Sequence, residues 1–271
     1  MLFRSSRNTY YFPVTIEDTD DGSEMECLTF IDNLGVSHTV QKTVDITPFV
    51  VRNVSGENNM CFWNCLSFLL NLDAKLLKDN LSKGLEKLRG AAVHASLAKQ
   101  LAPGAMAEDD AISLSCQIFS LEIVVHSLSL GCTTTFAAED ASKRIDILHD
   151  QEHFSLLFYK NDCFISAVAQ TFARDVNEMY RVLADKRFDE LTELLRLGNG
   201  LTLEDLEVGF KLLNIKAHVN KDGAYMQIND AGEINGFYSL VEDHLVACPP
   251  FSKNIFATKT VLNTNEHLSV S

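Results

Sequence analysis

Cys61 stands where a polar loop gives way to a helical pattern, a position that suits a nucleophile. Residues 48–54 predict a buried strand, and residues 56–60 form the loop. Apolar residues then recur at helical spacing, at Phe62, Cys65, Leu66, Leu69 and Leu70. The first turn of a helix favours a thiolate over a thiol, because it offers unpaired N–H groups and the positive end of the dipole. Cys61 is therefore a candidate nucleophile, and a small core residue is its alternative role.

His153 is the candidate base for this thiol. It lies 92 residues after Cys61 and directly precedes an apolar, aromatic-rich run, residues 154–159, that predicts a buried strand. Imidazole commonly activates a nucleophilic cysteine, and a histidine at the mouth of a strand can face a thiol at the mouth of a helix. His244 is a rival base, since long separations between cysteine and histidine are tolerated.

A third group usually orients the imidazole of such a pair. Asp162 follows His153 by nine residues. The intervening strand rises by about 3.3 Å per residue, which would carry Asp162 about 20 Å from the mouth of the strand. We therefore interpret Asp162 as a hairpin-turn residue.

Three segments resemble the ovarian-tumour (OTU) branch of the papain-like cysteine proteases. Residues 58–67 are similar to its nucleophile motif, Asp-Gly-Asn-Cys-Leu-Phe-Arg-Ala/Ser-Leu-Ser, and match best after the cysteine. Residues 108–125 resemble its acidic-start helix and following strand, and residues 152–157 resemble its histidine strand. Asn58 replaces the aspartate of the motif and Met60 its asparagine. Papain-like proteases of positive-strand RNA viruses carry similar Asn-Asn-Cys-aromatic loops.

The resemblance covers residues 48–170 and implies an α+β papain-like core, a central β-sheet flanked by helices. It implies that Cys61 attacks a carbonyl and that His153 shuttles the proton. The implied reaction is cleavage of an amide or isopeptide after the glycine-rich tail of ubiquitin or a ubiquitin-like protein. A viral polyprotein-processing protease and a glutamine deamidase are alternatives that use the same pair. A degenerate domain that only binds ubiquitin or another protein is the alternative outside the enzymes.

The resemblance also indicates where the orienting group would lie. One position is two residues after the histidine, at Ser155, and the other is three residues before the cysteine, at Asn58. Neither residue is an acid, and a neutral hydroxyl stabilises an imidazolium less well than a carboxylate does. Asp150 or Glu152 could therefore turn inward as the acidic partner, although charged residues at a strand entrance are usually solvated.

The composition of the loop before Cys61 also indicates the oxyanion donors and favours Cys61 over Cys65 as the nucleophile. The backbone amides of Cys61 and of the loop before it are the natural donors, with the side chain of Asn59 as a further one. Cys65 could replace Cys61 only if Phe62 and Trp63 formed the loop. Large apolar residues are poor loop formers, so we interpret Cys65 as a core residue.

Composition limits the class of partner. The chain has 271 residues and a net charge of −14, which disfavours a general nucleic-acid surface and suits a basic protein partner such as ubiquitin. Seven cysteines without a disulfide-framework spacing fit a reducing compartment. The sequence contains no zinc motif, signal-like start or apolar run long enough to span a membrane. We expect no metal, cofactor or membrane contact, and a cytoplasmic protein, in the host cytoplasm if it is viral or an effector.

The expected organisation has three parts. Residues 1–47 form an amino-terminal β unit, residues 48–170 the catalytic core, and residues 171–271 an α+β domain with helices near 174–185 and 187–197. Two segments of the last part echo the core at an offset of about 92 residues. This offset suggests a degenerate repeat without a cysteine at the matching position, and chance similarity of two common helix-then-strand patterns is the alternative.

Overall fold

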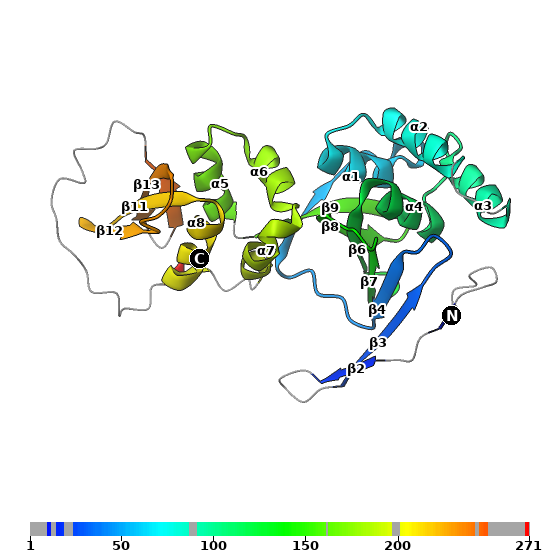
Figure 1. Ribbon diagram of the computed structural model, residues 1–271, viewed down its shortest axis with the longest axis horizontal. Coiled ribbons are helices and arrows are strands. Elements are labelled where there is room, and N and C mark those ends of the chain that lie inside the picture. The colour runs from blue at the N-terminus through cyan, green and yellow to red at the C-terminus, as the bar shows by residue number, and fades with distance from the viewer. Residues whose placement is uncertain are drawn as a thin grey trace. The chain divides into compact units, whose positions relative to one another are not determined.

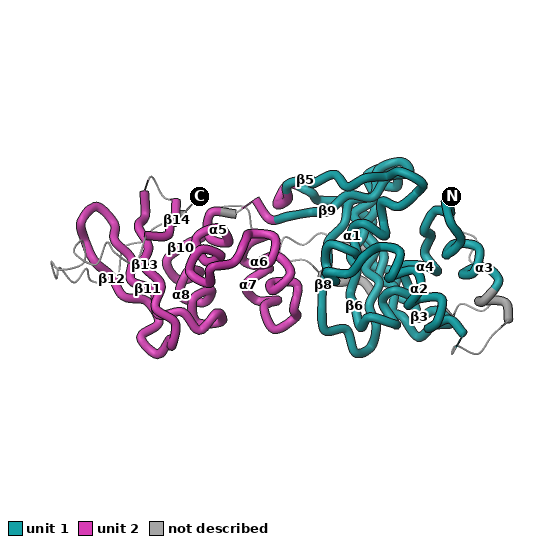
Figure 2. Tube along the Cα trace, turned by 90° about the horizontal axis from the view of Figure 1, so that it is seen from above, with its two compact units in different colours: residues 1–46, 50–158 teal, residues 47–49, 159–271 magenta. Residues whose placement is uncertain are grey.

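The structure is a computed structural model in which the described residues form two compact units (Figure 1). The described residues are 10–11, 15–18, 24–86, 91–160, 162–196, 201–241, 244–248 and 269–270. Unit 1 comprises residues 1–46 and 50–158, and unit 2 comprises residues 47–49 and 159–271 (Figure 2). The division at 158/159 differs from the boundary expected near residue 170, because the helix that follows residue 160 packs within unit 2.

Unit 1 is built on one large mixed sheet. Its strands are β1 (Tyr10–Tyr11), β2 (Thr15–Asp18), β3 (Glu24–Ile31), β4 (Ser37–Gln41), β5 (Phe49–Asn53), β6 (Leu121–Ser127), β7 (Cys132–Ala137), β8 (Lys143–Asp150) and β9 (His153–Tyr159). The order is β1-β3-β4-β7-β6-β8-β9-β5, with β2 beside β3. β6 and β8 are parallel, whereas β8 and β9 form an antiparallel hairpin. This order places the histidine strand β9 next to β5, which leads into the cysteine loop.

Among the described residues of unit 1, four helices accompany this sheet: α1 (Cys61–Leu70), α2 (Ala74–Leu85), α3 (Ala91–Leu101) and α4 (Asp109–Phe119). α1 ends at Asn71, whose left-handed φ of 53° stops the helix, and α2 begins where the Asp73 side chain accepts hydrogen bonds from two backbone amides of its first turn. α4 packs on β6 and β7. The largest buried side chains of unit 1 include Phe62 and Trp63, so α1 is anchored in the core.

The amino-terminal β unit continues the core sheet. β3 and β4 form a hairpin whose turn is closed by Asp32, with Oδ1 accepting from the amides of Leu34 and Val36 at 2.8 and 2.9 Å. β4 then pairs with β7 along its whole length. Residues 1–9, 12–14 and 19–23 of the expected unit lie outside the described residues. The described strands thus extend the sheet that carries the histidine strand.

Unit 2 has its own α+β core. Its helices are α5 (Asp162–Thr171), α6 (Val176–Leu183), α7 (Asp189–Arg196) and α8 (Leu203–Leu212), and its strands are β10 (Leu201–Thr202), β11 (Ile215–Lys221), β12 (Ala224–Ile228), β13 (Ile234–Val241), β14 (His244–Ala247) and β15 (Ser269–Val270). Four strands form a sheet in the order β12-β11-β13-β14, and β10 pairs with β15. The helices predicted near 174–185 and 187–197 are confirmed as α6 and α7. α5 packs against β13 and β14.

Candidate active site

Cys61 is the first residue of α1, as its sequence pattern predicts. The loop before it reaches this point through two consecutive left-handed residues, Asn58 at φ 55° and Asn59 at φ 57°, a conformation that asparagine tolerates. Met60 caps α1, and within the described part of the chain no side chain closes this cap. The first α1 hydrogen bond runs from the amide of Asn64 to the carbonyl of Met60. The amides of the first turn are therefore positioned to receive an oxyanion.

The side chain of Asn59 anchors this loop. Its Nδ2 donates to the carbonyl of Gly104 at 2.8 Å, and Nδ2 of Asn64 donates to the carbonyl of Ser55 at the same distance. Asn59 was predicted as an oxyanion donor, and the structure gives its amide a bond to the chain after α3. Asn58 is exposed.

His153 begins β9 and lies against the cysteine loop. A Cβ atom added to Gly56 would stand 2.9 Å from its Nδ1 and 3.0 Å from its Cε1. The next residue, Phe154, meets Phe62 edge to face, with ring centroids 5.5 Å apart. The neighbours of the two predicted catalytic residues thus pack on each other, and Cys61 and His153 belong to one corner of unit 1.

Ser155 follows His153 on the same face of β9, since side chains alternate along a strand. Its side chain is buried, and its Oγ donates to Oδ1 of Asn53 at 3.0 Å. Asn53 ends β5 and is exposed. Nothing in the sequence of residues 48–54 marks Asn53 as a functional residue.

Asp150 is the last residue of β8 and Glu152 lies in the turn before β9, and both are exposed. His149, at the end of β8, stacks on Phe154 with ring centroids 4.6 Å apart and has Nδ1 3.2 Å from Oγ of Ser127. Burial lowers the pKa of His149, which favours the neutral form of the ring that stacks on Phe154.

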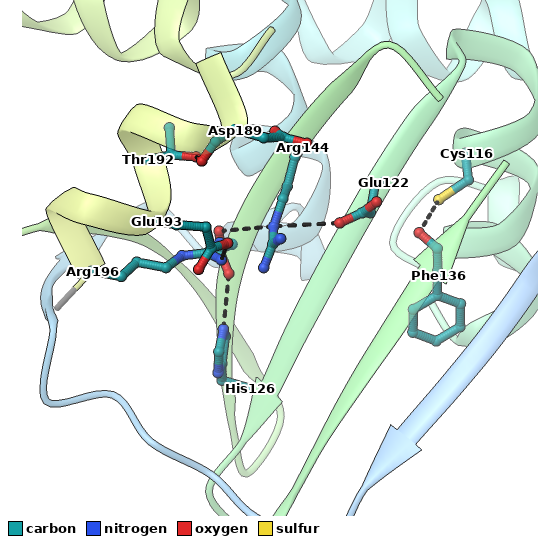
Figure 3. Close-up of polar contacts among 10 residues, drawn as sticks. Cys116, Glu122, His126, Phe136, Arg144, Asp189, Thr192, Glu193 and Arg196 are labelled. Atoms are coloured by element: carbon teal, nitrogen blue, oxygen red, sulfur yellow. Dashed lines mark hydrogen bonds and ion pairs between the residues drawn. The ribbon is translucent and has the colours of Figure 1, made fainter. Parts of the chain in front are cut away.

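Two other buried cysteines of unit 1, Cys65 and Cys116, are poor candidates for the nucleophile. Cys65 lies one turn into α1 with no exposed surface, and burial, followed by the nearby charge of Cys61, raises the pKa of its thiol far above the ordinary value. Burial likewise raises the pKa of Cys116, whose Sγ contacts the carbonyl of Phe136 at 3.5 Å (Figure 3). Both are inert core thiols.

A charged cluster on β6 and β8 contains no thiol. Nε2 of His126 lies 3.0 Å from Oδ1 of Asp146, and Nε of Arg144 lies 3.4 Å from a carboxylate oxygen of Glu122 (Figure 3). These residues connect neighbouring parallel strands, which is a structural role.

Unit 2 brings a second cysteine and a second histidine onto contacting elements. Cys163 is the second residue of α5 and is half-buried, and His244 is the exposed first residue of β14. Since α5 packs against β14, the unit repeats the arrangement of a cysteine at a helix start and a histidine at a strand start.

The interpretation of Asp162 as a turn residue was wrong, because it begins α5. His244, the rival base for Cys61, belongs to unit 2, whereas His153 shares unit 1 with Cys61.

A sequence signal for Cys163 was present. Asn161-Asp-Cys163-Phe164 repeats the Asn59-Met-Cys61-Phe62 order, but at an offset of 102 residues, whereas the two histidines are 91 residues apart. A comparison of the two halves at a single offset of about 92 residues therefore does not align Cys163 with Cys61. Residues 161, 242 and 243, which flank this second pair, lie outside the described residues.

Across the described residues, no group of three or more His, Cys, Asp or Glu side chains could hold a metal ion. No helix in the described part of the chain has both the length and the apolar character of a membrane span.

Comparison with known proteins adds a family match within unit 2. Residues 160–247 match the family model described as carlavirus endopeptidase. The RNA replication polyprotein of Apple stem pitting virus (isolate PA66) is 26% identical over 223 residues, which are 82% of this chain and 10% of that protein. The corresponding polyprotein of Blueberry scorch virus is 26% identical over 197 residues, 73% of this chain and 10% of that protein. The chain spans about a tenth of the length of these relatives.

Viral OTU domains are among the solved structures that are similar to this chain. The Hazara virus OTU bound to ubiquitin is 18% identical with a TM-score of 0.38, and the match covers 45% of this chain and 89% of that one. The viral OTU domain protease from Dera Ghazi Khan virus is 17% identical with a TM-score of 0.39, covering 48% and 94%. The chain has the α+β architecture that its motifs imply, and it resembles the papain-like, OTU-like cysteine proteases of viruses.

Proposed function

We propose that the chain is a cysteine protease in which Cys61 is the nucleophile and His153 the general base. The contact of His153 with Gly56, together with the packing of Phe154 on Phe62, carries this proposal. These contacts hold the start of β9 against the loop that positions Cys61. The inert Cys65 next to it leaves Cys61 as the nucleophile of α1.

The reaction follows from these positions. The Cys61 thiol gives its proton to the imidazole, and Sγ forms a bond to the carbonyl carbon of the substrate. The carbonyl oxygen becomes an oxyanion, which the amides of the first α1 turn stabilise. The imidazolium then protonates the leaving amine as the C–N bond breaks. Water, deprotonated by the same imidazole, hydrolyses the thioester and restores the thiol.

The proposed substrate is ubiquitin or a ubiquitin-like protein, cleaved after its carboxy-terminal tail. The motifs around Cys61 and His153 support this class, and the net charge of −14 suits a basic protein partner. The similarity to viral replication polyproteins supports action in the cytoplasm of a host cell. Glutamine deamidation and ubiquitin binding without catalysis are the alternatives to this activity.

A second activity is supported by unit 2. The family match to the carlavirus endopeptidase covers residues 160–247, which contain both Cys163 and His244. We propose that this pair performs endopeptidase cleavage of a polyprotein. Cell-free translation of the chain with flanking polyprotein sequence tests this step. Cleavage that is lost in Cys163→Ala and His244→Ala but kept in Cys61→Ala supports it, and cleavage unaffected by both of the first two variants contradicts it.

Ubiquitin carrying a thiol-reactive group at its carboxy terminus tests the first activity. We expect covalent capture by the intact chain and by Cys65→Ala, and no capture by Cys61→Ala. Cys65→Ala is the matched control, because it removes a thiol of the same helix that is fully buried. Binding of unmodified ubiquitin without capture would identify a binding domain, and capture that persists in Cys61→Ala would assign the reaction to another cysteine.

A further inference from the structure

The hydrogen bond between Ser155 and Asn53 fixes the direction of a hydroxyl that lies on the same face of β9 as the proposed base. Oγ of Ser155 donates its proton to Oδ1 of Asn53 at 3.0 Å. A serine hydroxyl has one proton and two lone pairs. With its proton held by Asn53, the buried oxygen has only lone pairs to offer to other groups.

The strand geometry directs this oxygen to the face that carries His153. His153 and Ser155 are two residues apart on β9 and therefore lie on one face. β5 is the edge strand next to β9, so Asn53 reaches Ser155 from the side. Hydrogen bonds of catalytic groups are often long without substrate and tighten in the complex.

We propose that Asn53 is a positioning residue for His153 and acts through Ser155. By holding the hydroxyl proton, Asn53 makes Ser155 an obligate acceptor for the N–H of the imidazole, so two neutral groups orient the ring. This inference rests on the proposed Cys61–His153 pair. It assigns a role to Asn53, and it explains how the site can orient its base while Asp150 and Glu152 stay exposed.

The chemistry of the pair sets the expected effect. A neutral acceptor holds the ring in one orientation and tautomer, but it stabilises the imidazolium less than a carboxylate would. Loss of the Ser155 acceptor removes one hydrogen bond to the imidazole. We therefore expect the rate of Cys61 alkylation to fall on the order of fivefold. Substrate binding should change little, so the loss should appear in kcat and not in KM.

The test measures alkylation of Cys61 by iodoacetamide across pH on the full chain, read from the peptide that contains Cys61. Four variants are compared: Asn53→Leu, which keeps the size but removes the acceptor; Asn53→Asp, which keeps Oδ1; Ser155→Ala; and the double variant Asn53→Leu with Ser155→Ala. We expect about a fivefold loss in both Asn53→Leu and Ser155→Ala, no further loss in the double variant, and near-normal reactivity in Asn53→Asp.

Two results would overturn the inference: normal alkylation in Asn53→Leu, or losses that multiply in the double variant. Asn53 is exposed at a sheet edge, so its variants should fold, and a circular dichroism melt confirms this. His153→Ala separates this inference from the proposed function. If His153→Ala leaves Cys61 alkylation unchanged, the Cys61–His153 pair itself fails. If His153→Ala matters and Asn53→Leu does not, only the role of Asn53 fails.

Discussion

Gly56→Ala is the perturbation that tests most sharply how His153 is held. The backbone of Gly56, at φ −95° and ψ 4°, is open to alanine, so the substitution brings little backbone strain. The new Cβ would stand 2.9 Å from Nδ1 of His153, whereas ordinary contacts begin at 3.4 Å. The imidazole or the loop must therefore move by about 0.5 Å, and a displacement of about 1 Å can cost about 100-fold in rate.

We expect Gly56→Ala to lower kcat for cleavage of a ubiquitin carboxy-terminal amide by about tenfold or more, with a smaller change in KM. Gly84→Ala in α2 is the matched control. Its Cβ would meet the flexible end of Ile118 at 2.6 Å, so it should lower the melting temperature without changing the rate per folded molecule. Full activity in Gly56→Ala would show that catalysis does not use His153 where the structure places it.

Three further predictions concern stability and the inert thiol. Cys65→Ala should keep Cys61 alkylation but lower the free energy of unfolding by about 1–2 kcal/mol in a urea titration, because it leaves a small core cavity; a loss of alkylation would contradict the role of Cys65 as a core residue. Burial alone would raise the pKa of Asp32, but hydrogen bonds led by that of His38 lower it below the ordinary value. Its contribution to stability is therefore present above the unfolded pKa near 4 and is lost as the pH falls through the lower folded pKa. Asp32→Asn should destabilise the chain at pH 7 and much less in strong acid, and equal effects in urea titrations at both pH values would refute this. Tyr238, whose pKa burial raises to about 12, shares a 2.7 Å hydrogen bond with Thr171, so Tyr238→Phe should destabilise unit 2 by about 1 kcal/mol and leave Cys61 reactivity unchanged by the same alkylation assay.

Local patterns in the sequence predict the elements that carry the proposed pair. The change from a polar loop to helical spacing places the start of α1 at Cys61, and the apolar run after His153 places β9. Both signals are short-range, since loop composition and hydrophobic periodicity depend only on neighbouring residues. These two elements are therefore predictable without any knowledge of the rest of the fold.

Pairings between distant segments were not predictable in this way. Residues 48–54 predict a buried strand, but β5 is the edge strand of its sheet and leaves Val50 and Val51 half exposed. The pairing of β4 with β7 joins residues that are about a hundred positions apart, so the amino-terminal strands could not be assigned to the core sheet from their own pattern. Asn53 was missed for the same reason, because its partner Ser155 lies 102 residues away.

The pH dependence of Cys61 alkylation in the intact chain and in His153→Ala tests the central claim most directly. If His153 activates Cys61, the intact chain should react well below the pKa of an unperturbed thiol, about 8.5, whereas His153→Ala should react only as the pH approaches that value. His244→Ala should follow the profile of the intact chain, because His244 belongs to unit 2. Profiles that coincide for the intact chain and His153→Ala would contradict the account.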